Sequence, residues 1–141
     1  MLILDSTILH EAIRPNPDPA VGTWLGAQPR DGLYTTSLAL ADILSGVERL
    51  PPGKRRTDLA AAVGQIFSFF ERRILPFDED AARAYPTIAQ NRKLLGKDGN
   101  VAVTMLAAIT RSRGATLASR TPEEFSGCGI RVVNPTDGGV G

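Results

Sequence analysis

Two acidic residues lie where a carboxylate could hold a divalent cation. Asp5 follows the apolar run "LIL" and precedes a predicted helix, with the hydroxyl residues Ser6 and Thr7 beside it. Asp42 lies within "LALADILSGV", where almost every neighbour is apolar. Mg²⁺ takes oxygen ligands, often one or two carboxylates with water, and a buried acid needs a metal or a partner. Asp5 and Asp42 are therefore candidate metal ligands, with Ser6 and Thr7 placed to position metal-bound water.

Each acid also has an explanation that needs no metal. Asp5 can cap the helix that follows it, because a side-chain oxygen at that position accepts from the first backbone N–H groups. Asp42 can point away from the apolar stripe of Leu40, Ile43 and Val47 and lie on a solvated helix face. Position in the sequence leaves both alternatives open.

Other residue types that often do chemistry are isolated in this chain. His10 is the single histidine, with no close acidic motif, and we expect a surface or packing role. Cys128 is the single cysteine, which excludes an intramolecular disulfide and suggests a small buried residue before a strand. Trp24 is expected in the core, and the basic run 54–56 on a solvated helix start.

Composition is that of one ordinary globular domain. The chain has 141 residues, and 16 Lys and Arg against 15 Asp and Glu give a net charge of +1, which neither requires nor excludes a nucleic-acid partner. No apolar run approaches the roughly 20 residues that cross a bilayer, and the amino terminus lacks the pattern of a signal peptide. We expect a cytoplasmic protein with one domain at 1–135 and a disordered tail at 136–141.

Short apolar runs alternate with helical stretches along the chain. The runs rich in β-forming residues predict strands at 2–5, 32–37, 73–77, 115–119 and 130–135. Amphipathic spacing and capping signals predict helices at 6–14, 17–28, 38–50, 55–73, from 78 onward, and 101–113. This alternation is typical of an α/β fold with a parallel sheet covered on both faces.

Local signals refine these boundaries and locate the expected site. Ser6 is the expected cap of the first helix, and Pro86 should kink or break the helix that Asp78 caps. Parallel sheets place their sites at the carboxyl ends of the strands. Asp5 ends the first strand, and Arg120 and Thr121 follow the fourth, where Arg120 could reach a phosphate.

Five segments in this order resemble the PIN-domain toxins of the VapC and FitB-like group. They are "LILDSTIL", "TTSLALADILSGV", "RILPFDEDAARAY", "AAITRSRGATLASRTPEEF" and "VVNP". The resemblance covers about residues 2–135. It implies a three-layer PIN-like fold with a sheet of about five strands in the order 3-2-1-4-5, a homodimer, and a Mg²⁺- or Mn²⁺-dependent endoribonuclease. It also implies an antitoxin that blocks the acidic pocket, with DNA contacted only through that antitoxin.

The acidic set of the family is only partly present. Asp5 matches the first acid, and Asp42 stands where the family usually has Glu. The third acid falls on Val103, and the fourth position, usually Asp or Asn, is Thr121. Glu124 matches an acid often found before the phenylalanine. We expect Asp5 and Asp42 to share one pocket, with Thr7 and Thr121 at its rim and Val103 pointing into it from the first turns of its helix.

The loss at Val103 leaves several functions open. Asp98 lies five residues upstream, but it is expected to be a solvated turn residue and not a replacement ligand. One metal ion held weakly by Asp5 and Asp42 would give an endoribonuclease toxin. A decayed site would give an inactive relative that binds its antitoxin and acts in operon repression. A metal-free RNA-binding module is the third alternative.

Overall fold

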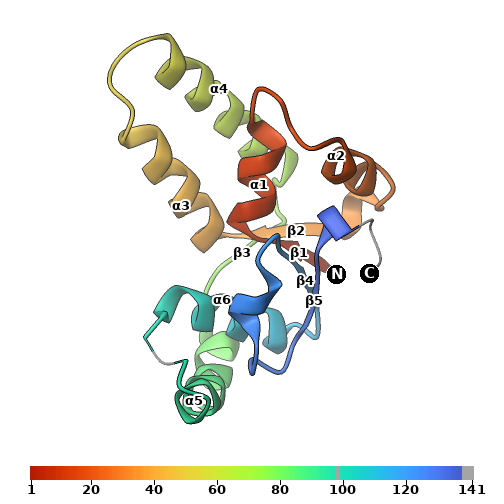
Figure 1. Ribbon diagram of the computed structural model, residues 1–141, viewed down its shortest axis with the longest axis vertical. Helices are drawn as coiled ribbons and strands as arrows, with labels where there is room; N and C mark the ends of the chain where they lie inside the picture. Colours follow the sequence, from red (N-terminus) through yellow and green to blue (C-terminus); the bar gives the residue numbers. More distant parts are fainter. Residues whose placement is uncertain (98, 138–141) are drawn as a thin grey trace.

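The computed structural model describes residues 1–97 and 99–137 and shows three layers, with a parallel sheet between two groups of helices (Figure 1). The sheet has the order β3-β2-β1-β4-β5, as the family resemblance implied. Its strands are β1 Leu2–Leu4, β2 Leu33–Thr36, β3 Ile74–Leu75, β4 Thr116–Ala118 and β5 Arg131–Val133. All paired strands are parallel, and the central residue Ile3 lies opposite Tyr34 of β2 and Leu117 of β4.

Six α-helices cover the two faces of the sheet. They are α1 Ser6–Ile13, α2 Pro19–Gly26, α3 Ser37–Glu48, α4 Lys54–Phe69, α5 Glu79–Leu94 and α6 Val101–Ser112. Helices α1 to α4 lie on one face, with α3 and α4 projecting beyond the sheet, and α5 and α6 lie on the other (Figure 1). The short 3-10 helices are η1 Arg30–Gly32, η2 Pro122–Phe125 and η3 Pro135–Asp137. None of the helices in the described residues is both long enough and apolar enough to span a bilayer.

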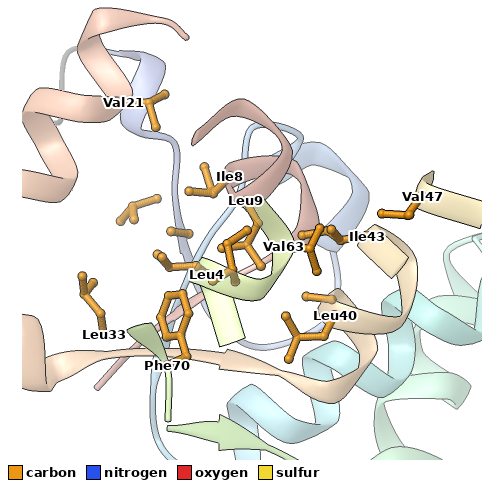
Figure 2. Close-up of a cluster of buried hydrophobic side chains, with 14 residues drawn as sticks. Leu4, Ile8, Leu9, Val21, Leu33, Leu40, Ile43, Val47, Val63 and Phe70 are labelled. Carbon is orange, nitrogen blue, oxygen red and sulfur yellow. The ribbon is translucent and has the colours of Figure 1, made fainter. Parts of the chain in front are cut away.

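Two apolar cores explain why the strands read as continuous hydrophobic runs. Leu4 faces one core, packed with α1, α3 and α4 through residues such as Ile43 and Val63 (Figure 2). Its neighbour Ile3 faces the other core, formed with α5 and α6 around Ile88. Successive strand residues point to opposite faces, so a strand buried on both sides is apolar at every position.

Two local predictions are corrected by the structure. Asp5, not Ser6, caps α1, because its carboxylate accepts from the N–H groups of Thr7 and Ile8. The predicted break at Pro86 does not occur, and α5 continues to Leu94. Pro86 is on the exposed side of α5, where water can satisfy the carbonyl that loses its donor, while Ala81 and Ile88 on either side are fully buried.

The carboxyl-terminal segment is more ordered than expected at its start. Residues 136 and 137 belong to η3, and the Asn134 side chain accepts from both the N–H and the hydroxyl of Thr136. An Asx turn of this kind satisfies local backbone groups without a sheet or helix. Residues 138–141 and Asp98 lie outside the described part of the chain, so the expectations for them remain expectations.

Candidate metal site

A pocket of about 210 Å³ lies where the carboxyl ends of the central strands meet the starts of three helices. Asp5 enters it from the end of β1, Asp42 from the second turn of α3, and Val103 from the first turn of α6. Glu124, on η2 after β4, also lines it, as do Ser6 and Thr7. The two candidate ligands and the valine at the missing acid therefore share one cavity, as predicted.

Asp5 both caps α1 and lines the pocket, so capping the helix does not exclude a role as a metal ligand. The residue is 4% exposed, and its Oδ1 accepts from the Thr7 N–H at 2.9 Å, the Thr7 hydroxyl at 2.5 Å and the Ile8 N–H at 3.2 Å. Burial raises the pKa of Asp5 above its ordinary value of 3.8, and hydrogen bonds from the Ser119 and Thr7 side chains offset part of that rise. A divalent cation in the pocket would compensate this poorly solvated charge.

Asp42 lines the pocket from a solvated position. Its side chain is 53% exposed, which agrees with the alternative that places Asp42 on a solvated helix face. Its Oδ2 lies 3.1 Å from Nε2 of His10 on α1, an acidic neighbour that the sequence around His10 did not indicate. The two residues are 32 positions apart, and only the packing of α1 against α3 brings them together.

Val103 closes the pocket with an apolar wall. It is the third residue of α6, 7% exposed, and its N–H donates to the Oδ1 of the capping residue Asn100 at 3.1 Å. Leu106 and Phe125 line the pocket beside it. Throughout residues 1–97 and 99–137, no group of three or more His, Cys, Asp or Glu side chains is arranged to hold a metal ion. The cavity is lined by the carboxylates of Asp5, Asp42 and Glu124, and these three are not grouped to hold one ion.

Hydroxyl groups connect Asp5 to the end of β4. The Thr7 hydroxyl that donates to Asp5 also accepts from the Arg120 N–H at 2.9 Å. Ser119, which the sequence reasoning had treated only as the end of a strand, is fully buried, and its hydroxyl accepts from the Thr121 N–H at 3.0 Å. Thr121 is not part of the pocket lining, and its hydroxyl donates to Oε2 of Glu124, which does line the pocket, at 3.4 Å.

The guanidinium of Arg120 binds Glu11 and is not part of the pocket lining. Its Nη1 donates to Oε2 of Glu11 at 2.6 Å, so the structure does not place this side chain for the predicted phosphate contact. Glu11 also accepts from Arg14 Nη1 at 2.9 Å and from the Asp18 N–H at 2.6 Å. This buried carboxylate therefore ties the loop after β4 to α1 and to the start of α2.

We expect Glu11→Gln to lower the thermal unfolding midpoint at pH 7. The Asp18 N–H, with Arg14 and Arg120, lowers the pKa of Glu11 below 4.5 against the opposing effect of burial. A carboxyl whose pKa is lowered in the folded state stabilises the protein at pH values above its ordinary pKa, and this stability is lost as the pH falls through the folded-state pKa. The difference in unfolding midpoint between the wild type and Glu11→Gln should therefore narrow in acid. Asp58→Asn, in the exposed pair with Lys54, is the control and should change little. A loss of unfolding midpoint in Glu11→Gln that is the same at every pH would contradict a stabilising role for the charged carboxylate.

Sequence comparisons agree with this architecture. A family model described as "PIN domain" matches residues 2–121. A VapC ribonuclease of Sinorhizobium fredii is 32% identical, the alignment covering 96% of this chain and 97% of the relative. Toxin FitB of Neisseria gonorrhoeae is also 32% identical, with 96% and 98% covered.

Solved structures give the same result. The crystal structure of FitAcB from Neisseria gonorrhoeae superposes with a TM-score of 0.89 at 32% identity, covering 96% of this chain and 99% of that one. A structure of FitAB bound to an IR36 DNA fragment gives the same TM-score and identity, covering 96% and 95%. DNA-bound VapBC from Salmonella typhimurium, at 21% identity and a TM-score of 0.79 over 95% and 97%, supports the fold alone.

Proposed function

Because the chain belongs to the PIN-domain family, we propose that it is the toxin of a toxin–antitoxin pair and a metal-dependent endoribonuclease. The observation that carries this proposal is the meeting of Asp5 and Asp42 in one pocket at the carboxyl ends of the strands. The names of the relatives, a VapC ribonuclease and the toxin FitB, support the same substrate class and biological role. Such a function would place the protein with cellular RNA in the cytoplasm.

The donors in the pocket suit Mg²⁺ or Mn²⁺. Asp5 and Asp42 offer hard carboxylate oxygens, and a buried carboxylate with a raised pKa gains most from a nearby cation. The bound ion would activate water and neutralise charge that develops on the phosphodiester. The protein's part is to hold Asp5 rigidly through Thr7 and Ile8, and to present Ser6 and Glu124 as the remaining polar lining.

The apolar wall at Val103 supports a weaker site than three acids would give. A valine presents no lone pair to the ion, whereas an acid at this position would add a further carboxylate beside Asp5 and Asp42. The same observation favours the second candidate function, an inactive relative that binds its antitoxin and takes part in operon repression. Metal binding and RNA cleavage distinguish the two, and a small reading frame directly upstream that encodes a DNA-binding antitoxin would fit both.

Expression without the antitoxin in a bacterial host tests the proposal. We expect growth arrest from the wild-type chain, none from Asp5→Asn, and cleavage of cellular RNA by purified protein only when Mn²⁺ or Mg²⁺ is present. Equal expression levels of the two forms, measured by immunoblot, provide the control. Normal growth with intact RNA, together with tight antitoxin binding, would instead establish the inactive relative. RNA binding that needs neither metal nor antitoxin would support the third alternative.

We also propose a homodimer. Helices α3 and α4 project beyond the sheet and carry the partly exposed apolar side chains of Leu44 and Phe67, which are 44% and 37% exposed. Exposed apolar groups of this kind favour protein contacts. Light scattering without antitoxin should give twice the chain mass of 15.0 kDa at tens of micromolar. A mass of one chain at that concentration would contradict the proposal.

A further inference from the structure

We propose that His10 is a positioning residue for Asp42, holding its carboxylate in the orientation that the metal pocket requires. The inference rests on the proposed function and adds a residue that is not part of the pocket lining. Its basis is the 3.1 Å contact between His10 Nε2 and Asp42 Oδ2, which joins α1 to α3 at the edge of the cavity.

The backbones that carry this pair are fixed by the core. Leu9, next to His10, is 3% exposed, and Ile43, next to Asp42, is 1% exposed, and both belong to the apolar cluster of Figure 2. The side chains themselves are 44% and 53% exposed. Helix packing therefore fixes the backbone positions of His10 and Asp42, and their mutual contact orients the two side chains.

The surface of α3 leaves room for the imidazole at Gly46. A β-carbon at Gly46 would lie 3.9 Å from Cε1 of His10, so the ring rests close to the helix one turn after Asp42. A methyl group would only reach van der Waals contact there. A longer side chain at this position would occupy the space of the ring and separate it from the carboxylate.

Asp42 depends on this contact because little else restrains it. Within residues 1–97 and 99–137, His10 is the one hydrogen-bond partner found for its side chain. A half-exposed aspartate without a partner exchanges among rotamers on a helix surface. When His10 donates to Oδ2, Oδ1 is left to the pocket. Partners that orient a metal ligand commonly change metal affinity by about 10–100-fold. In a site with few candidate ligands, the orientation of Asp42 has a large share of the metal affinity.

Mn²⁺ titration of the full chain, followed by electron paramagnetic resonance, tests the proposal without relying on activity. We expect His10→Ala to weaken Mn²⁺ binding about tenfold, the lower end of that range, because the pair is half exposed. His10→Gln should stay close to wild type, since its amide nitrogen can donate to the same oxygen. Lys54→Ala, which removes another exposed ion pair, is the matched control and should leave affinity unchanged. Without metal, all variants should share one unfolding midpoint.

Gly46→Met gives an independent route, because it displaces the ring and leaves both partners in place. It should weaken Mn²⁺ binding as His10→Ala does. Wild-type affinity in both His10→Ala and Gly46→Met, with binding still lost in Asp5→Asn, would overturn the role of His10 and leave the metal site standing. Failure of the wild-type chain to bind millimolar Mn²⁺ would overturn the proposed function and this inference together.

Discussion

Val103→Asp should raise Mn²⁺ affinity by at least tenfold and raise RNA cleavage with it. Position 103 lies in the first turn of α6 and already lines the pocket that holds Asp5 and Asp42. An aspartate there would add a further oxygen donor and a further negative charge beside Asp5 and Asp42. A tenfold change corresponds to about 1.4 kcal/mol, a modest gain for one added ligand. Calorimetric Mn²⁺ titration and cleavage of a fluorescent RNA measure the two effects.

The same substitution should destabilise the metal-free protein. Val103 is 7% exposed, so Val103→Asp buries a charge near Asp5 and should lower the free energy of unfolding by about 1–3 kcal/mol. Saturating Mn²⁺ should recover that loss, because a ligand that binds only the folded state stabilises it. Val103→Asn is the matched control, with similar size and polarity but no charge. Equal Mn²⁺ affinity in the wild type and Val103→Asp would show that the residue does not face the ion.

Asp5→Asn should change stability and metal binding in opposite directions. Burial raises the pKa of Asp5, so this group favours folding most below its ordinary pKa of 3.8 and loses that contribution as pH rises through the folded-state value. Wherever the buried carboxyl is ionised its charge therefore destabilises the fold, and Asn removes that charge while still accepting from Thr7 and Ile8. We expect Asp5→Asn to raise the free energy of unfolding by about 0.5–2 kcal/mol in metal-free buffer, as substitutions at functional sites commonly do.

The metal response is the other half of this comparison. Mn²⁺ should raise the unfolding midpoint of the wild-type chain and leave that of Asp5→Asn unchanged. RNA cleavage by Asp5→Asn should fall to the level of buffer alone. Below pH 3.8, where the wild-type carboxyl is protonated in both states, the two forms should unfold at similar temperatures. A metal-free Asp5→Asn that is less stable than wild type at pH 7 would mean that capping by the charged group outweighs its desolvation.

The strands, the helices and the parallel sheet could be predicted because they depend on local patterns. "LIL", "YTT" and "TLA" are short apolar or β-branched runs between helical stretches, and each became a buried strand. Asp78 was expected as a helix cap, and its side chain accepts from the backbone as predicted. Pro86 failed as a breaker because packing on both sides of it outweighs its local preference.

The site was predictable only where one residue occupies a strand end or an aligned position. Asp5, Asp42 and Val103 fall into that class, and they share the pocket. The contact of His10 with Asp42 and that of Arg120 with Glu11 join residues 32 and 109 positions apart, so they depend on helix packing that no local pattern encodes. The buried hydroxyl of Ser119 was missed because a strand end of this kind gives no periodic signal.

Calorimetric titration of the purified wild-type chain with Mn²⁺, repeated with Asp5→Asn and Asp42→Asn, tests the metal site most directly. We expect one ion bound per chain with weak, roughly millimolar affinity (about −4 kcal/mol), because no three acidic side chains of the described residues are grouped to hold an ion and Val103 supplies no ligand. Both substitutions should abolish this binding. No binding by the wild-type chain in millimolar Mn²⁺, or binding that survives both substitutions, would contradict a metal site formed by Asp5 and Asp42.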